Sequence, residues 1–172
     1  MGNEAAIIAP IPEVEAVVGP LRQRHDRAAL LGVPAHITLL YPFFSAHSAI
    51  NEIATLREVC ANFESFGFAF TEVRRFSATC YLSPDRSDAF TEMIRALIHR
   101  WPQCVPYGGA HAEIVPHLTV ADGVDAATMD AVEVVLRRQL PIRCVAGEIW
   151  LMTSDEGGVW SRAADFRMAP TT

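Results

Sequence analysis

The sequence predicts an α+β fold in which two pseudo-symmetric lobes form one domain. The chain has 172 residues, close to the length of a single domain that buries a substantial core. The order strand, helix, strand, helix, strand is expected over residues 5–73 and again over residues 76–146, and each copy holds a His-x-Thr strand. We therefore expect one domain over residues 1–172, built from an internal duplication and a C-terminal hairpin.

The first repeat opens with a short apolar strand at residues 5–9. Apolar residues at helical spacing predict a helix at residues 12–24, and Pro12 suits its first turn, where the missing N–H does no harm. A second strand is expected at residues 35–41 and should end at Pro42, which cannot continue a central ladder. A helix at residues 48–61, capped by Ser48 or Asn51, and a strand at residues 66–73 follow.

The second repeat has the same order of elements. It is expected to hold a strand at residues 76–82 and a helix at residues 85–101 that Pro102 stops. A strand at residues 115–121, a helix from the capping residue Asp125 to about Arg138 and a strand at residues 140–145 complete it. Beyond it, a strand at residues 147–152 and the turn Glu156-Gly157-Gly158 predict a hairpin that continues into residues 159–166.

Composition narrows the classes of protein. Hydrophobic residues make up 51% and charged residues 20% of the chain, and no uninterrupted apolar run reaches the roughly 18 residues that a membrane helix needs. The N-terminus has acidic residues and prolines where a secretory signal needs a basic start and an apolar stretch. We therefore expect a cytoplasmic monomer with no membrane partner. The four cysteines form no C-x-x-C pair and are expected to be reduced and packed: Cys60, Cys80, Cys104 and Cys144.

The net charge of −6 has the wrong sign for a protein that binds long nucleic acid, because such binding relies on neutralised phosphates. A small nucleotide or a short RNA end, held at a few points, remains compatible with this charge.

The segments VPAHITLLY and IVPHLTVAD contain the candidate catalytic residues. Side chains alternate faces along a strand, so His36 and Thr38 share one face. His117 and Thr119 share a face in the same way, while aliphatic residues occupy the opposite faces. A polar face of this kind is expected to line a cleft, and facing lobes would bring the two pairs together.

Two imidazoles supply both a base and an acid near neutral pH, as the cleavage of a phosphodiester requires. Threonine hydroxyls can donate hydrogen bonds to the phosphate oxygens, whose charge changes in the transition state. No carboxylate cluster and no H-E-x-x-H spacing is present, so neither a metal nor a cofactor is expected. A lone histidine in an apolar strand is usually structural, but two copies at the same place in a repeated order favour chemistry.

HITL and HLTV resemble the paired signature of the 2H phosphoesterase superfamily. VPAHITLLYPF and VPHLTVAD resemble its 2′-5′ RNA ligase-like branch, and the resemblance spans nearly the whole chain. It implies an antiparallel sheet with flanking helices in each lobe and an active-site groove between the lobes. It also implies catalytic roles for His36 and His117 and phosphate binding by Thr38 and Thr119.

The resemblance further implies a hydrolase that acts on a 2′,3′-cyclic phosphate or a 2′-5′ phosphodiester, in a nucleotide, an ADP-ribose derivative or an RNA end undergoing processing. For a cyclic phosphate, His117 would be the base for water and His36 the acid for the leaving ribose oxygen, but pseudo-symmetry leaves the reverse assignment open. The alternative function is a non-catalytic module that binds phosphorylated nucleotides or RNA ends.

Residues near the motifs have two interpretations. Tyr41, Phe43 and Tyr107 could stack on a base, although core or loop packing is the commoner role of such residues. The basic run Arg22, Arg24 and Arg27 could meet phosphates, but solvation of a helix end is favoured. His25, His47, His99 and His111 lack a Thr two residues later and are expected at the surface. Trp150 and Trp160 remain unassigned.

Overall fold

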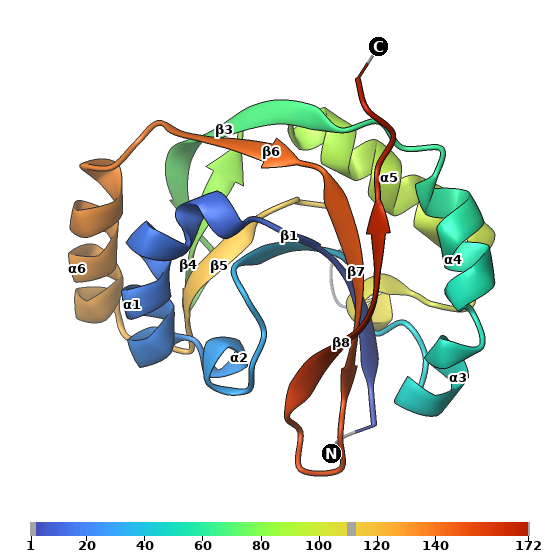
Figure 1. Ribbon diagram of the computed structural model, residues 1–172. Coiled ribbons are helices and arrows are strands. Elements are labelled where there is room, and N and C mark those ends of the chain that lie inside the picture. The colour runs from blue at the N-terminus through green and yellow to red at the C-terminus, as the bar shows by residue number, and fades with distance from the viewer. Residues whose placement is uncertain (1–2, 110–112, 172) are drawn as a thin grey trace.

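A computed structural model describes residues 3–109 and 113–171 and contains two four-stranded antiparallel sheets (Figure 1). The first sheet has the order β2 (His36–Leu40), β1 (Ala5–Pro10), β7 (Glu148–Ser154) and β8 (Trp160–Arg167). The second has the order β5 (Leu118–Asp122), β4 (Thr79–Pro84), β3 (Phe66–Arg75) and β6 (Ile142–Ala146). The predicted α+β fold with an antiparallel sheet in each lobe is confirmed.

Helices flank the two sheets. In chain order they are η1 (Pro12–Val14), α1 (Glu15–His25), α2 (Arg27–Leu30), α3 (Ala46–Ile50), α4 (Ile53–Cys60), α5 (Ser87–Arg100), η2 (Pro106–Gly109) and α6 (Ala126–Arg137). Figure 1 shows α1 and α6 at one end of the molecule and α3, α4 and α5 at the other. Helix α1 follows β1 in the chain but contacts β5, and α5 follows β4 but contacts β2. This exchange of helices ties the two sheets together.

One hydrophobic core runs through both sheets. Ile37 of β2 and Leu118 of β5 are fully buried in it, together with Val18 of α1 and Leu97 of α5. Because both exchanged helices contribute to this core, the two lobes share their main source of hydrophobic stabilisation.

The two lobes have the same local order but not the expected boundaries. The series β1, α1, β2 has its counterpart in β4, α5, β5, and β2 and β5 are each an edge strand paired with the strand before them. However, β3 was expected to end the first repeat and instead lies in the second sheet, while β7 and β8 complete the first sheet. Strand pairing joins segments that are distant in the chain, so the order of the elements did not determine which sheet each strand joins. The duplication itself stays a prediction.

Local signals account for most helix ends. Asp125 caps α6 as predicted, because its side chain accepts a hydrogen bond of 2.8 Å from the backbone N–H of Thr128. The single helix expected at residues 48–61 is two helices, and the cap of the first is Ser45, whose Oγ accepts from the N–H of Ser48 at 3.3 Å. The assignment of the cap to Ser48 or Asn51 is therefore wrong. Helix α2 was not expected from the sequence.

All four cysteines are buried and free, as predicted. Within residues 3–109 and 113–171, none of the helices has the length and apolar character that a membrane crossing requires.

Candidate active site

The two His-x-Thr segments come together where the sheets meet. His36 opens β2, His117 directly precedes β5, and the two strands contact each other. The aliphatic residues that alternate with the motif are at most 1% exposed: Ile37, Leu39, Leu118 and Val120. The motif side chains are half-buried on the other face: His36, Thr38, His117 and Thr119. The alternation that the strands predicted is present in both lobes.

Both imidazole rings are held in the same way. Nδ1 of His36 donates to the carbonyl oxygen of Pro34 at 2.7 Å, and Nδ1 of His117 donates to that of Val115 at 2.6 Å. A carbonyl only accepts, so these contacts place the proton of the neutral ring on Nδ1. In each neutral ring, Nε2 is therefore left with a lone pair that can accept a proton.

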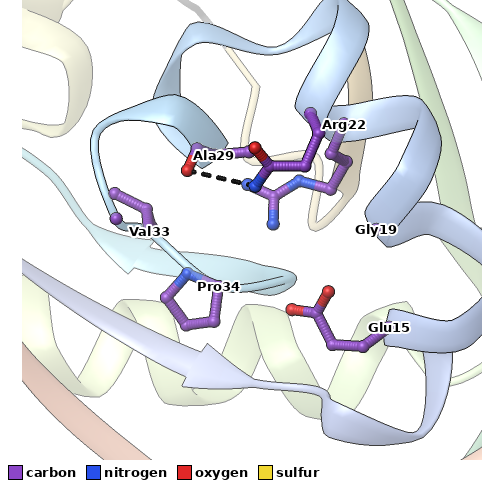
Figure 2. Close-up of a pocket in the computed structure, with 8 residues that line it drawn as sticks. Glu15, Gly19, Arg22, Ala29, Val33 and Pro34 are labelled. Carbon is purple, nitrogen blue, oxygen red and sulfur yellow. Dashed lines mark hydrogen bonds between the residues drawn. The ribbon is translucent and has the colours of Figure 1, made fainter.

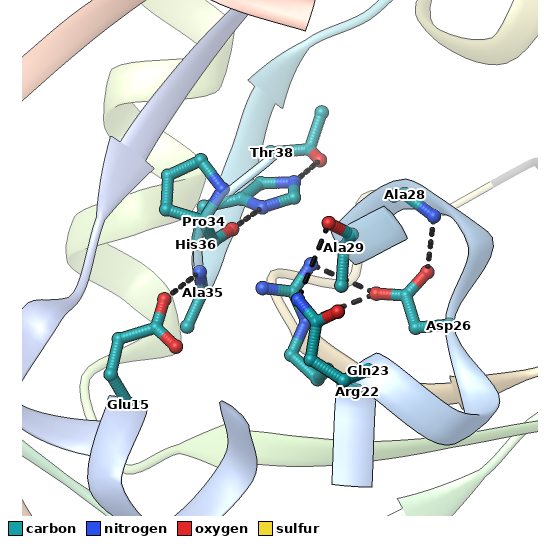
Figure 3. Close-up of polar contacts among 10 residues, drawn as sticks. All are labelled: Glu15, Arg22, Gln23, Asp26, Ala28, Ala29, Pro34, Ala35, His36 and Thr38. Atoms are coloured by element: carbon teal, nitrogen blue, oxygen red, sulfur yellow. Dashed lines mark hydrogen bonds and ion pairs between the residues drawn. The ribbon is translucent and has the colours of Figure 1, made fainter. Parts of the chain in front are cut away.

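Thr38 contacts the reactive nitrogen of its own motif. Its Oγ1 lies 3.1 Å from Nε2 of His36 (Figure 3). Since the neutral Nε2 carries no proton, the threonine hydroxyl is the donor. Tyr107 also hydrogen-bonds Thr38, and this contact partly offsets the rise in the pKa of the tyrosine that burial causes.

His36 is neutral at physiological pH. Burial is the main cause that lowers its pKa from 6.5 to about 4, because the charged ring loses its hydration. The hydrogen bond to Pro34 raises the pKa in part, while the positive charge of Arg22 and that of His117 lower it.

We expect this burial to make stability depend on pH. Between pH 6.5 and about 4, the unfolded chain protonates His36 and the folded protein does not, so the free energy of unfolding falls as the pH falls. Relative to His36→Asn, which removes the titration, the wild type should lose about 1–3 kcal/mol over this range, allowing for solvent screening of a half-buried ring. Urea denaturation at a series of pH values measures the difference, and parallel curves for the two proteins would contradict it.

Arg22 is buried, which corrects its interpretation as a solvated residue of a basic run. Its side chain is 2% exposed, and its Nε and Nη2 donate to Oδ2 of Asp26 at 3.0 and 2.9 Å (Figure 3). Asp26 uses its other oxygen to cap α2, accepting from the N–H of Ala28 at 2.9 Å. The partner one helical turn later explains why the charge can be buried.

A cavity of about 230 Å³ lies behind the start of β2, next to this ion pair. Figure 2 shows Arg22 and Glu15, both from α1, on one side of it and Val33 and Pro34 on the other. Oε1 of Glu15 accepts from the backbone N–H of Ala35 at 2.5 Å. Glu15 thus holds, from α1, the segment that presents His36, and Arg22 lines the same cavity.

An aromatic pair flanks His117. Phe76 stacks on Tyr81 with ring centroids 4.4 Å apart, and the imidazole of His117 meets both rings at 5.2 Å in edge-on geometry. Sequence analysis did not identify either aromatic residue as part of the site. Both precede the motif by more than 30 positions in the chain, and pairing of β4 with β5 brings them close.

An apolar pocket of about 290 Å³ flanks His36, and we call it the His36 pocket. His36 and Thr38 lie in its lining, together with Tyr41 and Trp160. Its remaining walls come from β1, β7 and the region of α2: Ala6, Ile8, Met152, Arg27, Ala28, Leu31 and Val33. Trp160, which the sequence left unassigned, thus belongs to the surroundings of the site.

The three candidates for stacking have different surroundings. Tyr41 is half-buried in the His36 pocket, and the ring of Tyr107 meets it at 6.2 Å, with the N–H of Tyr107 donating to the carbonyl of Tyr41. Phe43 is 3% exposed and packs edge-on against Trp101 in the core, so it is not available to a ligand. For Phe43, the stacking interpretation is wrong and core packing is confirmed.

Among the other histidines, His47 and His99 are exposed, His25 is half-buried, and His111 lies outside the described residues. In the part of the chain that the structure describes, no group of three or more His, Cys, Asp or Glu side chains is placed to hold a metal ion.

Comparison with known proteins adds a family and a fold. The model of the 2′-5′ RNA ligase superfamily matches residues 10–158. The structure of E. coli LigT complexed with 3′-AMP superposes with a TM-score of 0.65 at 13% identity, over 98% of this chain and 99% of that one.

Two further solved structures are similar. One, described as a phosphoesterase, has a TM-score of 0.65 at 15% identity over 97% and 99% of the two chains. A protein of Thermus thermophilus has a TM-score of 0.67 at 13% identity over 98% and 100%. At these identities the likeness shows the fold alone. No curated protein matches the sequence.

Proposed function

Because this chain belongs to the 2′-5′ RNA ligase superfamily, we propose that it is a phosphoesterase for a 2′,3′-cyclic phosphate or a 2′-5′ phosphodiester. The substrate would be a nucleotide, an ADP-ribose derivative or a short RNA end. One observation carries the proposal. Two imidazoles at the starts of two edge strands that contact each other are each anchored through Nδ1 to a carbonyl two residues earlier, so Nε2 is the nitrogen of each ring that would transfer a proton.

For hydrolysis of a cyclic phosphate, the neutral state of His36 favours it as the base. Its Nε2 takes a proton from water as the water oxygen forms a bond to phosphorus. The bond from phosphorus to one ribose oxygen breaks, and protonated His117 gives its Nε2 proton to that oxygen. Exchange with solvent then restores both rings. This order is the reverse of the one expected from the sequence, and the lowered pKa of His36 is the reason for the change.

The threonines would hold the phosphate. Thr38 and Thr119 share the polar face with the histidines, so their hydroxyls can donate to non-bridging oxygens. In the free protein Thr38 donates to Nε2 of His36. When a phosphate binds, this hydroxyl turns to the phosphate oxygen, and Nε2 is released to accept the proton of water.

The net charge of −6 supports a small substrate over long RNA. The similar structure of E. coli LigT was solved with 3′-AMP. A nucleotide of that size is consistent with the His36 pocket of about 290 Å³ beside the motif.

Turnover in the presence of EDTA tests the proposal. The panel contains the four 2′,3′-cyclic nucleotides, ADP-ribose cyclic phosphate and a 2′-5′-linked dinucleotide. The blank is the double variant His36→Ala/His117→Ala, purified in parallel to exclude contaminating phosphodiesterases. We expect the wild type to turn over at least one substrate without a free metal ion. Binding of nucleotide with no turnover of any substrate would instead identify a non-catalytic binding module.

A further inference from the structure

Beside His36, the first sheet has an apolar face that none of the long helices in the described part of the chain covers. The buried side chains of a small cluster lie there, separate from the main core: Ala6, Ile8, Val33 and Met152. The partly buried residues packed against this cluster are Ala28, Tyr41, Trp150 and Trp160. Of the helices that the structure describes, α2, which has four residues, contributes to the lining of the His36 pocket. Apolar surface left open in this way commonly marks a ligand site.

We propose that the His36 pocket holds the nucleobase of the substrate, stacked against Trp160, while the phosphate lies on His36 and Thr38. The position of the phosphate in this inference rests on the proposed function. The new element is the side of the site on which the base binds. The pocket volume of about 290 Å³ lies just below the roughly 300–1,000 Å³ of small-molecule sites, which suits one base rather than two.

The chemistry of the lining fits a nucleotide. Two aromatic rings, Tyr41 and Trp160, meet at 6.2 Å with an interplanar angle of 65°, and Trp160 is only half-buried. Every base offers a flat face for such rings. Among the described residues, the lining includes the exposed cation Arg27 and no carboxylate. A guanidinium in this position favours an anionic ligand and can itself stack on a base.

The wall that carries Trp160 is fixed before any ligand arrives. The backbone N–H of Trp160 donates to the carbonyl of Leu31 at 2.7 Å, which joins β8 to the turn after α2. Gly32 in that turn has a φ of +95°, and a Cβ there would lie 2.7 Å from the carbonyl oxygen of Trp160. Only glycine allows this close approach. Asp26 anchors the other end of α2 through its cap on Ala28. A preformed wall reduces the ordering cost of binding.

Binding of adenosine 2′-monophosphate and adenosine 3′-monophosphate, compared with inorganic phosphate, tests the inference by calorimetry without any need for turnover. Trp160→Ala removes the stacking surface, and Ala28→Phe fills the pocket without removing a contact. Trp150→Ala is the matched control, because Trp150 is half-buried in the same hairpin and packs against the same small cluster, but it lines a different cavity and not the His36 pocket. Thermal unfolding of each variant shows whether it is folded.

We expect Trp160→Ala and Ala28→Phe to weaken binding of both nucleotides about 10-fold to 100-fold, while phosphate binding stays within about twofold of wild type. Trp150→Ala should bind all three probes as the wild type does. Any of three results would overturn the base site. The variants could lose nucleotide and phosphate binding equally, the folded variants could bind nucleotide as before, or the wild type could bind phosphate but no nucleotide.

If Phe76→Leu weakened nucleotide binding and Trp160→Ala did not, the base would lie on the flank of His117. That result would also overturn the proposed base site in the His36 pocket. Nucleotide binding that depends on Trp160 in a protein without turnover would leave the base site standing and overturn only the catalytic proposal.

Discussion

His36→Asn and His117→Asn are each expected to lower kcat for the cyclic phosphate substrate by about 10²–10⁴-fold, the usual contribution of a positioned acid or base. Asparagine is the informative replacement. Its amide nitrogen can take the place of Nδ1 and still donate to the carbonyl of Pro34 or Val115, whereas nothing replaces Nε2. The variants therefore remove proton transfer and keep the anchor of the side chain.

Steady-state kinetics in EDTA, with thermal unfolding of each protein, measures this loss. The double variant His36→Asn/His117→Asn should be little slower than the worse single variant, because an acid and a base that act in one step are not additive. His99→Asn is the matched control, since His99 is exposed at the end of α5, and its rate should stay close to that of the wild type. A histidine variant that keeps near wild-type kcat would remove that residue from the mechanism.

The elements that the sequence predicts well are those governed by local patterns. The alternation around His36 and His117 follows from strand geometry alone, so burial of Ile37 and Leu118 could be expected from the sequence. The cap of α6 by Asp125 is equally local. Fold class and motif faces therefore needed only the residues within each segment.

Long-range contacts explain what the sequence could not show. β7 pairs with β1 and β3 pairs with β6, and each pair joins segments far apart in the chain. The two sheets therefore do not coincide with the two repeats expected from the sequence. Trp160 reaches the His36 pocket only because the C-terminal hairpin joins the first sheet. Arg22 could have been found from its spacing to Asp26, because an arginine four residues before an aspartate can form an ion pair within a helix and its C-cap.

Arg22→Met is expected to reduce the free energy of unfolding by about 3–5 kcal/mol, the cost of leaving one member of a buried ion pair without its partner. Arg22 is 2% exposed and Asp26 5%, so the carboxylate would stay in an apolar setting without a counter-charge. Urea denaturation at neutral pH measures the change. Arg24→Met, at an exposed position of the same helix, is the control and should shift stability by no more than about 0.5 kcal/mol.

The double variant Arg22→Met/Asp26→Asn separates the charge from the packing. Asparagine can still cap α2 through its side-chain oxygen, and methionine fills much of the volume of the arginine stem, so most of the lost stability should return. Removing the positive charge of Arg22 should also raise the pKa of His36, because that charge disfavours the imidazolium. An NMR titration of the His36 ring would detect the rise. A double variant as unstable as Arg22→Met, with the His36 titration unchanged, would show that Arg22 acts through its packing and not through its charge.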